Sequence, residues 1–236
     1  MTVPCPLESF PADGCAVVVG AGGGVGAALA EALTASGRFT AVHALRRADL
    51  DLEDEASIAA AAARLDAPPR LVIVATGLLH GQGVAPEKAL RAVDPAALLK
   101  SYAVNAVGPV LVAKHFTPLF PRAGKATFAA LSARVGSLGD NRLGGWHGYR
   151  ASKAALNMLL RNVAIELGRS RPQAVCLALH PGTVDTGLSA PFQGGVPGER
   201  LFTPAFSAAR LLEVIDHRGP EDSGGVFDWA DKPVPW

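Results

Sequence analysis

The chain of 236 residues has little cysteine and almost no net charge. Cys5, Cys15 and Cys176 are too few and too scattered for a disulfide framework or a zinc knuckle. The 22 basic and 21 acidic side chains nearly cancel, which removes the electrostatic argument for nucleic acid or an anionic membrane as the main partner. The composition indicates a reduced, cytoplasmic, globular protein.

Long apolar runs and clustered metal ligands are also lacking. Apolar runs such as 71–75 have the length of a strand, so we expect no membrane span. The first 14 residues contain three prolines and no basic cluster, so we expect a short leader into the first strand rather than a secretion signal. The six histidines show no i,i+4 pair and no cysteine partner, which argues against a metal site.

Short β-branched runs alternate with longer helical stretches, which is the pattern of βαβ units around a parallel sheet. We expect strands at 15–19, 40–45, 71–76, 127–132, 174–179 and 225–229, and helices at 25–36, 53–65, 95–116, 149–168 and 204–215. Gly108-Pro109 should bend the third helix. The pattern predicts a single α/β domain over 1–236, a doubly wound Rossmann fold with helices on both faces of the sheet. Segment 186–203 is rich in Gly and Pro and is expected to be a loop or lid over a substrate.

A glycine-rich turn joins the first strand to the first helix. The run from Gly20 to Gly26 fits both G-x-x-x-G-x-G and G-x-G-x-x-A. Glycines let backbone N–H groups approach a pyrophosphate at a helix N-terminus, where the helix dipole favours anions. No lysine follows the glycines, which disfavours a P-loop. The turn therefore predicts a dinucleotide site.

The end of the second strand bears on which dinucleotide binds. An acid about twenty residues after the glycines would accept from a ribose 2′-hydroxyl, whereas an arginine accommodates a 2′-phosphate. This chain has Arg46-Arg47 at that place, and the nearest acid, Asp49, comes later. A guanidinium can pair with a phosphate dianion. NADP(H) is therefore preferred, with NAD(H) as the alternative.

Tyr149 and Lys153 open the long helix at 149–168. Their four-residue spacing places both side chains on one helical face. An ammonium beside a phenol favours the phenolate, so we expect Lys153 to lower the pKa of Tyr149. A tyrosine tuned in this way can give a proton to a carbonyl oxygen while hydride arrives from a nicotinamide.

The order of these motifs resembles the short-chain dehydrogenase/reductase (SDR) family over essentially the whole chain. The motifs are Gly20-x-x-x-Gly24-x-Gly26, Asn105, a serine-bearing strand end, Tyr149-x-x-x-Lys153 and Pro181-Gly182. The stretches Ser132–Ser137, Tyr149–Asn157 and His180–Thr186, with the closing Phe227-Asp-Trp, resemble the branch of C-factor-like signalling proteins and carbonyl reductases.

The resemblance implies roles for individual residues. Tyr149 would be the general acid/base, Lys153 would bind the nicotinamide ribose, and Asn105 would hold a water in a proton relay behind the lysine. Ser132 would hydrogen-bond the substrate carbonyl, and Asp51 would lie at the adenine pocket. The expected cofactor contacts are Gly20, Gly22, Gly24, Val25, Gly26, Arg46, Arg47, Asp51, Leu52, Thr76, Gly77, Tyr149, Lys153, Pro181, Gly182, Val184 and Thr186.

The chain departs from the family's pattern at its catalytic serine. The family's strand ends Ser-Ser-x-x-Gly and its second serine is catalytic, whereas this chain has Ala133 at that place. Ser132 lies one residue earlier, and one residue turns a side chain to the other face of a strand. Ser132 and, less directly, Ser137 remain candidates for the role.

Two functions remain open. The first is an NADP(H)-dependent oxidoreductase that interconverts a carbonyl and an alcohol on a small molecule. The second is a cofactor-binding signalling or sensor protein with little or no turnover, which the missing second serine keeps open. Segments 137–147 and 186–203 should shape any substrate pocket, with Trp146 and Phe192 either lining it or lying on exposed loops. The resemblance also implies a homo-oligomer, a dimer or tetramer formed through the helices at 95–116 and 149–168.

Overall fold

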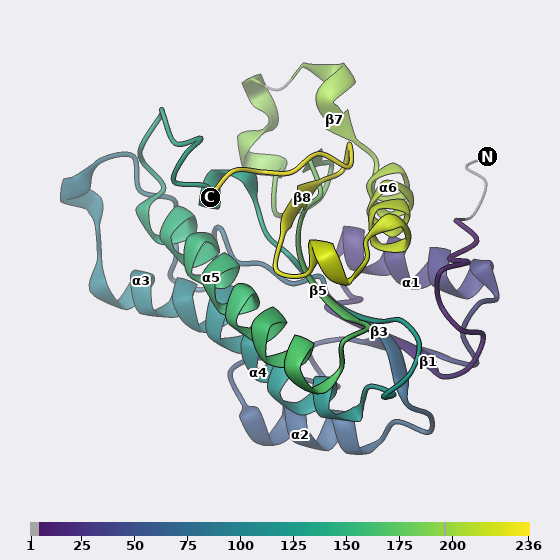
Figure 1. Ribbon diagram of the computed structural model, residues 1–236. Helices are drawn as coiled ribbons and strands as arrows, with labels where there is room; N and C mark the ends of the chain where they lie inside the picture. The colour runs from purple at the N-terminus through teal and green to yellow at the C-terminus, as the bar shows by residue number, and fades with distance from the viewer. Residues whose placement is uncertain (1–4, 196) are drawn as a thin grey trace.

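A six-stranded parallel sheet forms the centre of the molecule in a computed structural model, which describes residues 5–195 and 197–236 (Figure 1). Its strands are β1 (Cys15–Val19), β2 (Val42–Leu45), β3 (Pro69–Val74), β4 (Ala126–Leu131), β5 (Ala174–His180) and β8 (Val226–Asp228). They lie in the order β2-β1-β3-β4-β5-β8, and every pairing is parallel. The chain order reverses between β1 and β3, and ligands bind in the crevice outside the carboxyl ends of strands at such a switch point. The first four residues of the expected leader lie outside the described residues.

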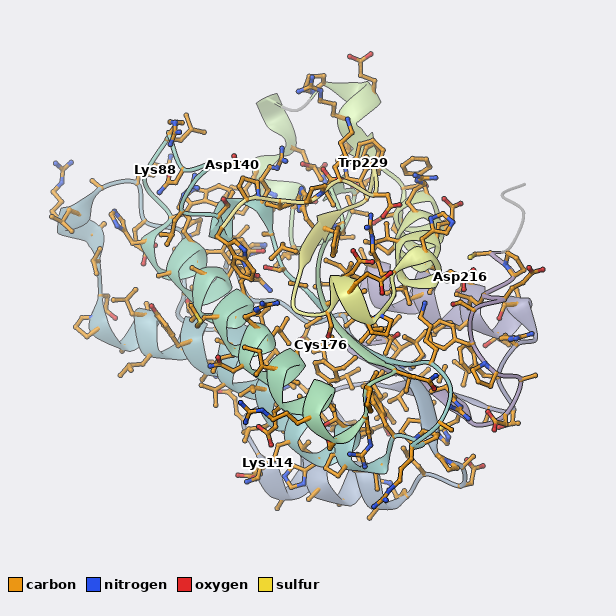
Figure 2. All side chains as sticks on the ribbon, viewed as in Figure 1. Lys88, Lys114, Asp140, Cys176, Asp216 and Trp229 are labelled. Carbon is orange, nitrogen blue, oxygen red and sulfur yellow. The ribbon has the colours of Figure 1, made fainter. Side chains whose placement is uncertain are left out.

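Helices cover both faces of this sheet. Figure 1 shows α1 (Gly24–Ser36) and α6 (Pro204–His217) on one side, and α2 (Glu55–Ala63), α3 (Pro95–Tyr102), α4 (Gly108–Phe116) and α5 (His147–Ser170) on the other. Two apolar cores result, one on each face of the sheet. The inner strands are buried on both faces, which is why Val, Ile, Leu and Ala predominate in them without alternation. Cys176 lies among these residues in β5 (Figure 2). The predicted doubly wound Rossmann fold is confirmed.

Local signals in the sequence explain where the helices begin and end. Asp54, Asp94 and Thr203 precede α2, α3 and α6, and each side chain accepts a hydrogen bond from a backbone N–H of the first turn. Gly37 ends α1 in the left-handed conformation at φ +62°. The remaining differences from the predicted boundaries are a few residues at element ends, where fraying and tertiary contacts decide.

The predicted helix at 95–116 is interrupted rather than merely bent. A π-helical segment, Ala103–Val107, separates α3 from α4. Pro109 lacks an N–H and its ring blocks the carbonyl four residues earlier, so the extra residue in the π turn takes up the mismatch. At Gly108 a Cβ would lie 2.6 Å from Cβ of Leu52, so glycine is required for the close approach of the loop that precedes α2.

One helical segment within the described residues has the length and composition of a membrane span, which the strand-sized apolar runs of the sequence did not indicate. Pro95–Leu119, which includes the π turn, is long and apolar enough to cross a bilayer by length and composition. The apolar run is not contiguous in the sequence, so a search for strand-sized runs missed it. In the structure Phe116 and Val112 of this segment are fully buried in the core beneath the sheet, which is the position of a core helix.

The segment predicted as a loop at 186–203 has local structure. Its base is closed by a short parallel pair between β6 (Thr183–Val184) and β7 (Leu201–Phe202), and 3-10 turns occur at Ala190–Gly195 and Gly198–Arg200. Trp229, which is labelled in Figure 2, packs against Phe202 with 4.4 Å between the ring centroids. Aromatic contacts between distant parts of the chain therefore hold the base of this segment, which local sequence patterns do not reveal.

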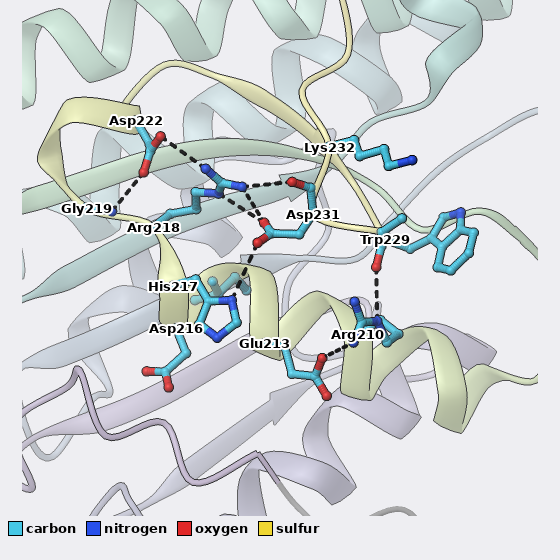
Figure 3. Close-up of polar contacts among 12 residues, drawn as sticks. Arg210, Glu213, Asp216, His217, Arg218, Gly219, Asp222, Trp229, Asp231 and Lys232 are labelled. Carbon is cyan, nitrogen blue, oxygen red and sulfur yellow. Dashed lines mark hydrogen bonds and ion pairs between the residues drawn. The ribbon is translucent and has the colours of Figure 1, made fainter.

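Ion pairs fix the turn that follows α6. Arg218 pairs with Asp222 at 3.3 Å and with Asp231, and Arg210 donates to the carbonyl oxygen of Trp229 (Figure 3). At the chain's end the carbonyl oxygen of Trp236 accepts a hydrogen bond from the N–H of Gly139, at 2.6 Å. The C-terminal segment is thereby held beside the loop that follows β4.

Candidate active site

A cavity of about 860 Å³ lies at the carboxyl ends of β1, β3, β4 and β5. It is lined by the glycine turn, by the ends of these strands, by the start of α5 and by the segment after β5. Most of the predicted site residues meet on this wall, and they are Gly20, Gly22, Gly24, Val25, Arg47, Asp51, Leu52, Thr76, Gly77, Ser132, Tyr149, Lys153, Pro181, Gly182, Val184 and Thr186. Residues far apart in the sequence therefore share one cavity.

The glycine turn is open at Gly22 and Gly23, whereas at Gly20, Gly24 and Gly26 an added Cβ would clash with neighbouring protein atoms. At Gly22 and Gly23 an added Cβ would meet no atom closer than 3.6 Å. At Gly26 a Cβ would clash with the carbonyl oxygen of Gly20, so Gly26 permits the tight turn and does not line the cavity. The hydroxyl oxygen of Thr76, opposite Gly20, is buried without a partner among the described residues. An open glycine cradle facing a spare hydroxyl fits a dinucleotide.

The two arginines after β2 differ in their surroundings. Arg47 lines the cavity and pairs with Asp51 at 3.5 Å and with Glu53 at 3.7 Å. The side chain of Arg46 lies beside Gly22, with its Cγ 3.8 Å from the Cβ position of that glycine. The guanidinium of Arg46 has no carboxylate partner within the described part of the chain, so it is available for an anion at this end of the turn.

Tyr149 and Lys153 lie on one face of α5, one turn apart, as their spacing predicts. The Nζ atom of Lys153 lies 5.8 Å from the centroid of the Tyr149 ring. Lys153 is 2% exposed and donates a hydrogen bond to the carbonyl oxygen of Leu131, the last residue of β4, at 2.8 Å. This bond fixes the ammonium between the strand end and the phenol.

The expected lowering of the tyrosine pKa is not found, and this prediction was wrong. Burial raises the pKa of Tyr149 to about 12 and lowers the pKa of Lys153 to about 7. Each shift has desolvation as its cause, because a buried site disfavours the charged form of either group. The four-residue spacing correctly placed the two groups together, but it carried no information on how far burial removes them from solvent.

Asn105 lies in the π-helical segment, behind the lysine rather than on the cavity wall. Its Oδ1 accepts from the N–H of Leu78 at 2.7 Å, and its Nδ2 donates to the carbonyl oxygen of Leu78 and to Oγ of Ser152. Both side chains reach Gly77. Asn105 Oδ1 lies 4.0 Å, and Lys153 Nζ 3.9 Å, from the position that a Cβ of this glycine would occupy. Asn105 therefore links the segment after β3 to α5 next to Lys153.

The start of α5 is held by an acid that the sequence did not single out. Trp146, the residue before the helix, has φ +51° and provides no side-chain cap. The carboxylate of Glu87 accepts from the N–H of Gly148 at 3.1 Å, and Glu87 is only 7% exposed. Glu87 and Gly148 are 61 residues apart in the sequence, so a local capping motif could not indicate this contact.

Within the described residues no group of three or more His, Cys, Asp or Glu side chains could hold a metal ion. Cys5, Cys15 and Cys176 are free thiols.

Comparison with known proteins agrees with this geometry. A family model described as "Enoyl-(Acyl carrier protein) reductase" matches residues 8–212. The chain belongs to the short-chain dehydrogenase/reductase family of oxidoreductases. The resemblance inferred from the motifs is thus confirmed.

Individual SDR relatives cover much of the chain. It is 38% identical over 149 residues to C-signal of Myxococcus xanthus, with 63% of this chain and 84% of that protein covered. It is 35% identical over 176 residues to 1-hydroxy-2-glutathionyl-2-methyl-3-butene dehydrogenase of a Rhodococcus species, with 74% and 73% covered. Among solved structures, an NADPH-bound carbonyl reductase from chicken fatty liver matches with a TM-score of 0.78 at 25% identity, over 94% of this chain and 98% of that one.

The serine position is where this SDR chain departs from the motif. Ser132 and Ala133 both line the cavity. The hydroxyl of Ser132 donates to Oδ1 of Asn157 on α5, at 2.6 Å. Ser137 does not line the cavity; its hydroxyl accepts from the N–H of Asp140 at 3.1 Å. Of the two serines, only Ser132 lies where a substrate could meet it.

Aromatic side chains form part of the cavity wall beside Tyr149. The rings of Trp146 and Phe192 lie 5.1 Å apart, and the Trp146 ring lies 6.3 Å from that of Tyr149. His80 packs on Phe192 at 5.8 Å. Trp146 and Phe192 therefore line the cavity, which was one of the two positions expected for them, the other being exposed loops.

Several lining residues were not predicted. They are Leu50, Leu79, Gln82, Val104, Val135 and His180. Leu188 and Ser189 also line the cavity, and they lie in segment 186–203, which was expected to shape it. Leu79 and Gln82 follow β3, and His180 ends β5. Because ligands bind outside the carboxyl ends of parallel strands, the positions of these residues after the predicted strands could have indicated them.

Proposed function

We propose that this protein is an NADP(H)-dependent oxidoreductase that interconverts a ketone or aldehyde and the corresponding alcohol. The observation that carries the proposal is the convergence of Tyr149 and Lys153 with an open glycine turn in one cavity. Both parts of a proton-transfer device thus lie beside a cradle that fits a pyrophosphate.

The cofactor assignment rests on the chain's own residues. Gly22, Gly23 and the start of α1 would hold the pyrophosphate, and Arg46 and Arg47 would face the 2′-phosphate. Thr76 offers a hydroxyl without a partner among the described residues. The chicken fatty liver carbonyl reductase with a similar fold is described with NADPH, which supports this choice over NAD(H).

The proton chemistry follows from the positions of three side chains. NADPH, when bound, supplies the hydride for the carbonyl carbon. The Tyr149 hydroxyl gives its proton to the carbonyl oxygen and is left as a phenolate. A protonated Lys153 beside the ring stabilises that phenolate, and Asn105 behind it orders the segment through which a proton returns. Ser132 also lies at the cavity wall, with its hydroxyl proton directed to Asn157 on α5.

The remaining features of the proposal concern the chain as a whole. We assign one catalytic domain, with segment 186–203 closing over a small-molecule substrate and the protein located in the cytoplasm, which suits its three free thiols. A homo-oligomer formed through α3–α4 and α5 is supported by exposed apolar side chains on those helices and the π turn between them. These are Leu99, Val107, Met158 and Ile165.

A signalling or sensor function with little turnover is the second candidate. Two observations favour it, namely Ala133 at the place of the family's catalytic serine and the 38% identity to C-signal. In that case the cofactor would bind and the carbonyl chemistry would be slow or absent.

Fluorescence titration of the purified protein with NADPH and, separately, NADH tests the cofactor assignment without a guess about substrate. We expect clearly tighter binding of NADPH. A preference for NADH would overturn the role given to the arginines and leave the oxidoreductase standing. Binding of neither would overturn the dinucleotide site.

A further inference from the structure

Carbonyl reduction in this site lacks an evident second hydrogen-bond donor. Negative charge grows on the carbonyl oxygen as hydride arrives, and donors aimed at that oxygen stabilise the transition state. Tyr149 supplies one donor. Ala133 has none, and the hydroxyl proton of Ser132 is directed to Oδ1 of Asn157 at 2.6 Å.

His180 lies next to this gap. It is the last residue of β5, and the register of β4 with β5 pairs Leu131 with Leu179. The N–H of Ser132 donates to the carbonyl oxygen of Leu179, at 2.7 Å, so His180 follows directly beside Ser132. His180 lines the same cavity as Tyr149 and Lys153.

The imidazole of His180 is not paired with another protein group within the described residues. Its Nδ1 is buried and unbonded within the described residues, and the residue itself lines the cavity. Buried polar groups in native proteins are nearly always paired, so a histidine ring with no protein partner at a cavity wall is a candidate for contact with a ligand through its other nitrogen, Nε2. Burial lowers the pKa of His180 to about 4. The negative charge of Asp228 opposes this shift, and the positive charge of Arg134 adds to it. The ring is therefore neutral at physiological pH and can carry a proton on Nε2.

We propose that His180 is a catalytic residue of the carbonyl reaction, whose Nε2–H donates a hydrogen bond to the substrate's carbonyl oxygen. The inference rests on the proposed oxidoreductase function. The hydrogen stays on His180 throughout, and the proton that joins the oxygen comes from Tyr149. His180 thus performs the stabilising task for which the family's second serine is missing in this chain.

The first test compares His180→Phe, which keeps a ring of similar size without a donor, with His180→Gln, which keeps an N–H. Each is assayed for NADPH oxidation with a ketone that wild-type protein reduces. We expect His180→Phe to lose kcat on the order of 100-fold, with a smaller change in KM, because the bond strengthens as charge develops. We expect His180→Gln to keep more of the rate. The matched control is His217→Phe, an exposed histidine on α6, which should behave as wild type.

The second test restores the serine. Ala133→Ser in the His180→Phe background should recover a large part of the lost rate, whereas the same change in wild type should add little. Unchanged NADPH affinity, measured by fluorescence, shows that the variants are folded.

Two outcomes would overturn the proposal. One is wild-type kcat in a folded His180→Phe variant. The other is a rate that stays as low in His180→Gln as in His180→Phe and is not restored by Ala133→Ser, since the defect would then not be a missing donor. Failure of the oxidoreductase function itself would show separately, as turnover that persists in Tyr149→Phe or is absent from wild type.

Discussion

Lys153 Nζ donates a hydrogen bond to the carbonyl oxygen of Leu131 at 2.8 Å and lies 5.8 Å from the centre of the Tyr149 ring. The bond ties α5, which carries both side chains of the proposed proton-transfer pair, to the end of the central strand β4. It also holds a lysine where burial disfavours its charge, so the site sacrifices stability for function.

Replacement of Lys153 should therefore stabilise the fold at neutral pH. The folded pKa of Lys153, about 7, is below its ordinary value of 10.5, so the unfolded chain binds more protons between these values. The free energy of unfolding therefore rises with pH between about 7 and 10.5, and this contribution of Lys153 is lost as the pH falls toward 7. We expect Lys153→Met to gain on the order of 2–3 kcal/mol at pH 7, after loss of the bond to Leu131, with a smaller gain at pH 10. Urea unfolding at both pH values measures this, and a variant less stable than wild type at pH 7 contradicts it.

Alcohol oxidation should increase steeply with pH. Oxidation requires the phenolate of Tyr149, whose pKa burial raises to about 12. The phenolate fraction then grows about tenfold per pH unit below that value. We expect kcat for oxidation to rise continuously from pH 7 to 10, while Tyr149 remains protonated and competent for reduction over that range. An oxidation profile that reaches its plateau near pH 7 would show that the tyrosine pKa is lowered instead.

The two arginines after β2 should contribute unequally to cofactor choice. Arg46 has no carboxylate partner in the described part of the chain, whereas Arg47 already pairs with Asp51 and Glu53. We expect Arg46→Ala to weaken NADPH binding about 10- to 100-fold and to leave NADH binding nearly unchanged, because only NADPH carries the 2′-phosphate. Arg47→Ala should have the smaller effect. Titrations with both nucleotides decide this, and equal losses for the two nucleotides would refute it.

Glu87 should stabilise the start of the catalytic helix. Its buried carboxylate accepts from the N–H of Gly148, where helix α5 has no side-chain cap from Trp146. We expect Glu87→Ala to lower the free energy of unfolding by about 1–2 kcal/mol, as for the loss of an N-cap. Glu166→Ala, at an exposed position of the same helix, is the matched control and should change stability by less than about 0.5 kcal/mol. Equal stability of the two variants would exclude the capping role.

Much of the fold was predictable because its signals are local. Continuous apolar runs indicated the buried strands, and a glycine such as Gly37 is a local signal for a helix end. The π turn at Ala103–Val107 was not predictable, because it depends on the close approach of Gly108 to Leu52. Leu52 is distant in the sequence.

The site was predictable where a motif carries the chemistry. Spacing placed Tyr149 beside Lys153, and the glycine pattern identified the cradle. The pKa of Tyr149 and the unpaired ring of His180 were not predictable, because both depend on burial by residues from other elements. Gln82 and Val104 likewise line the cavity only because of how the chain folds.

The most direct test of the central proposal is NADPH oxidation by wild type and Tyr149→Phe over a panel of ketones and aldehydes. The wild type should consume NADPH with at least one carbonyl and form the alcohol in equal amount. Tyr149→Phe should bind NADPH as wild type does and lose nearly all turnover, because the proton donor is gone. Undiminished turnover in Tyr149→Phe, or NADPH binding by wild type without turnover of any carbonyl, would contradict the account and favour the sensor function.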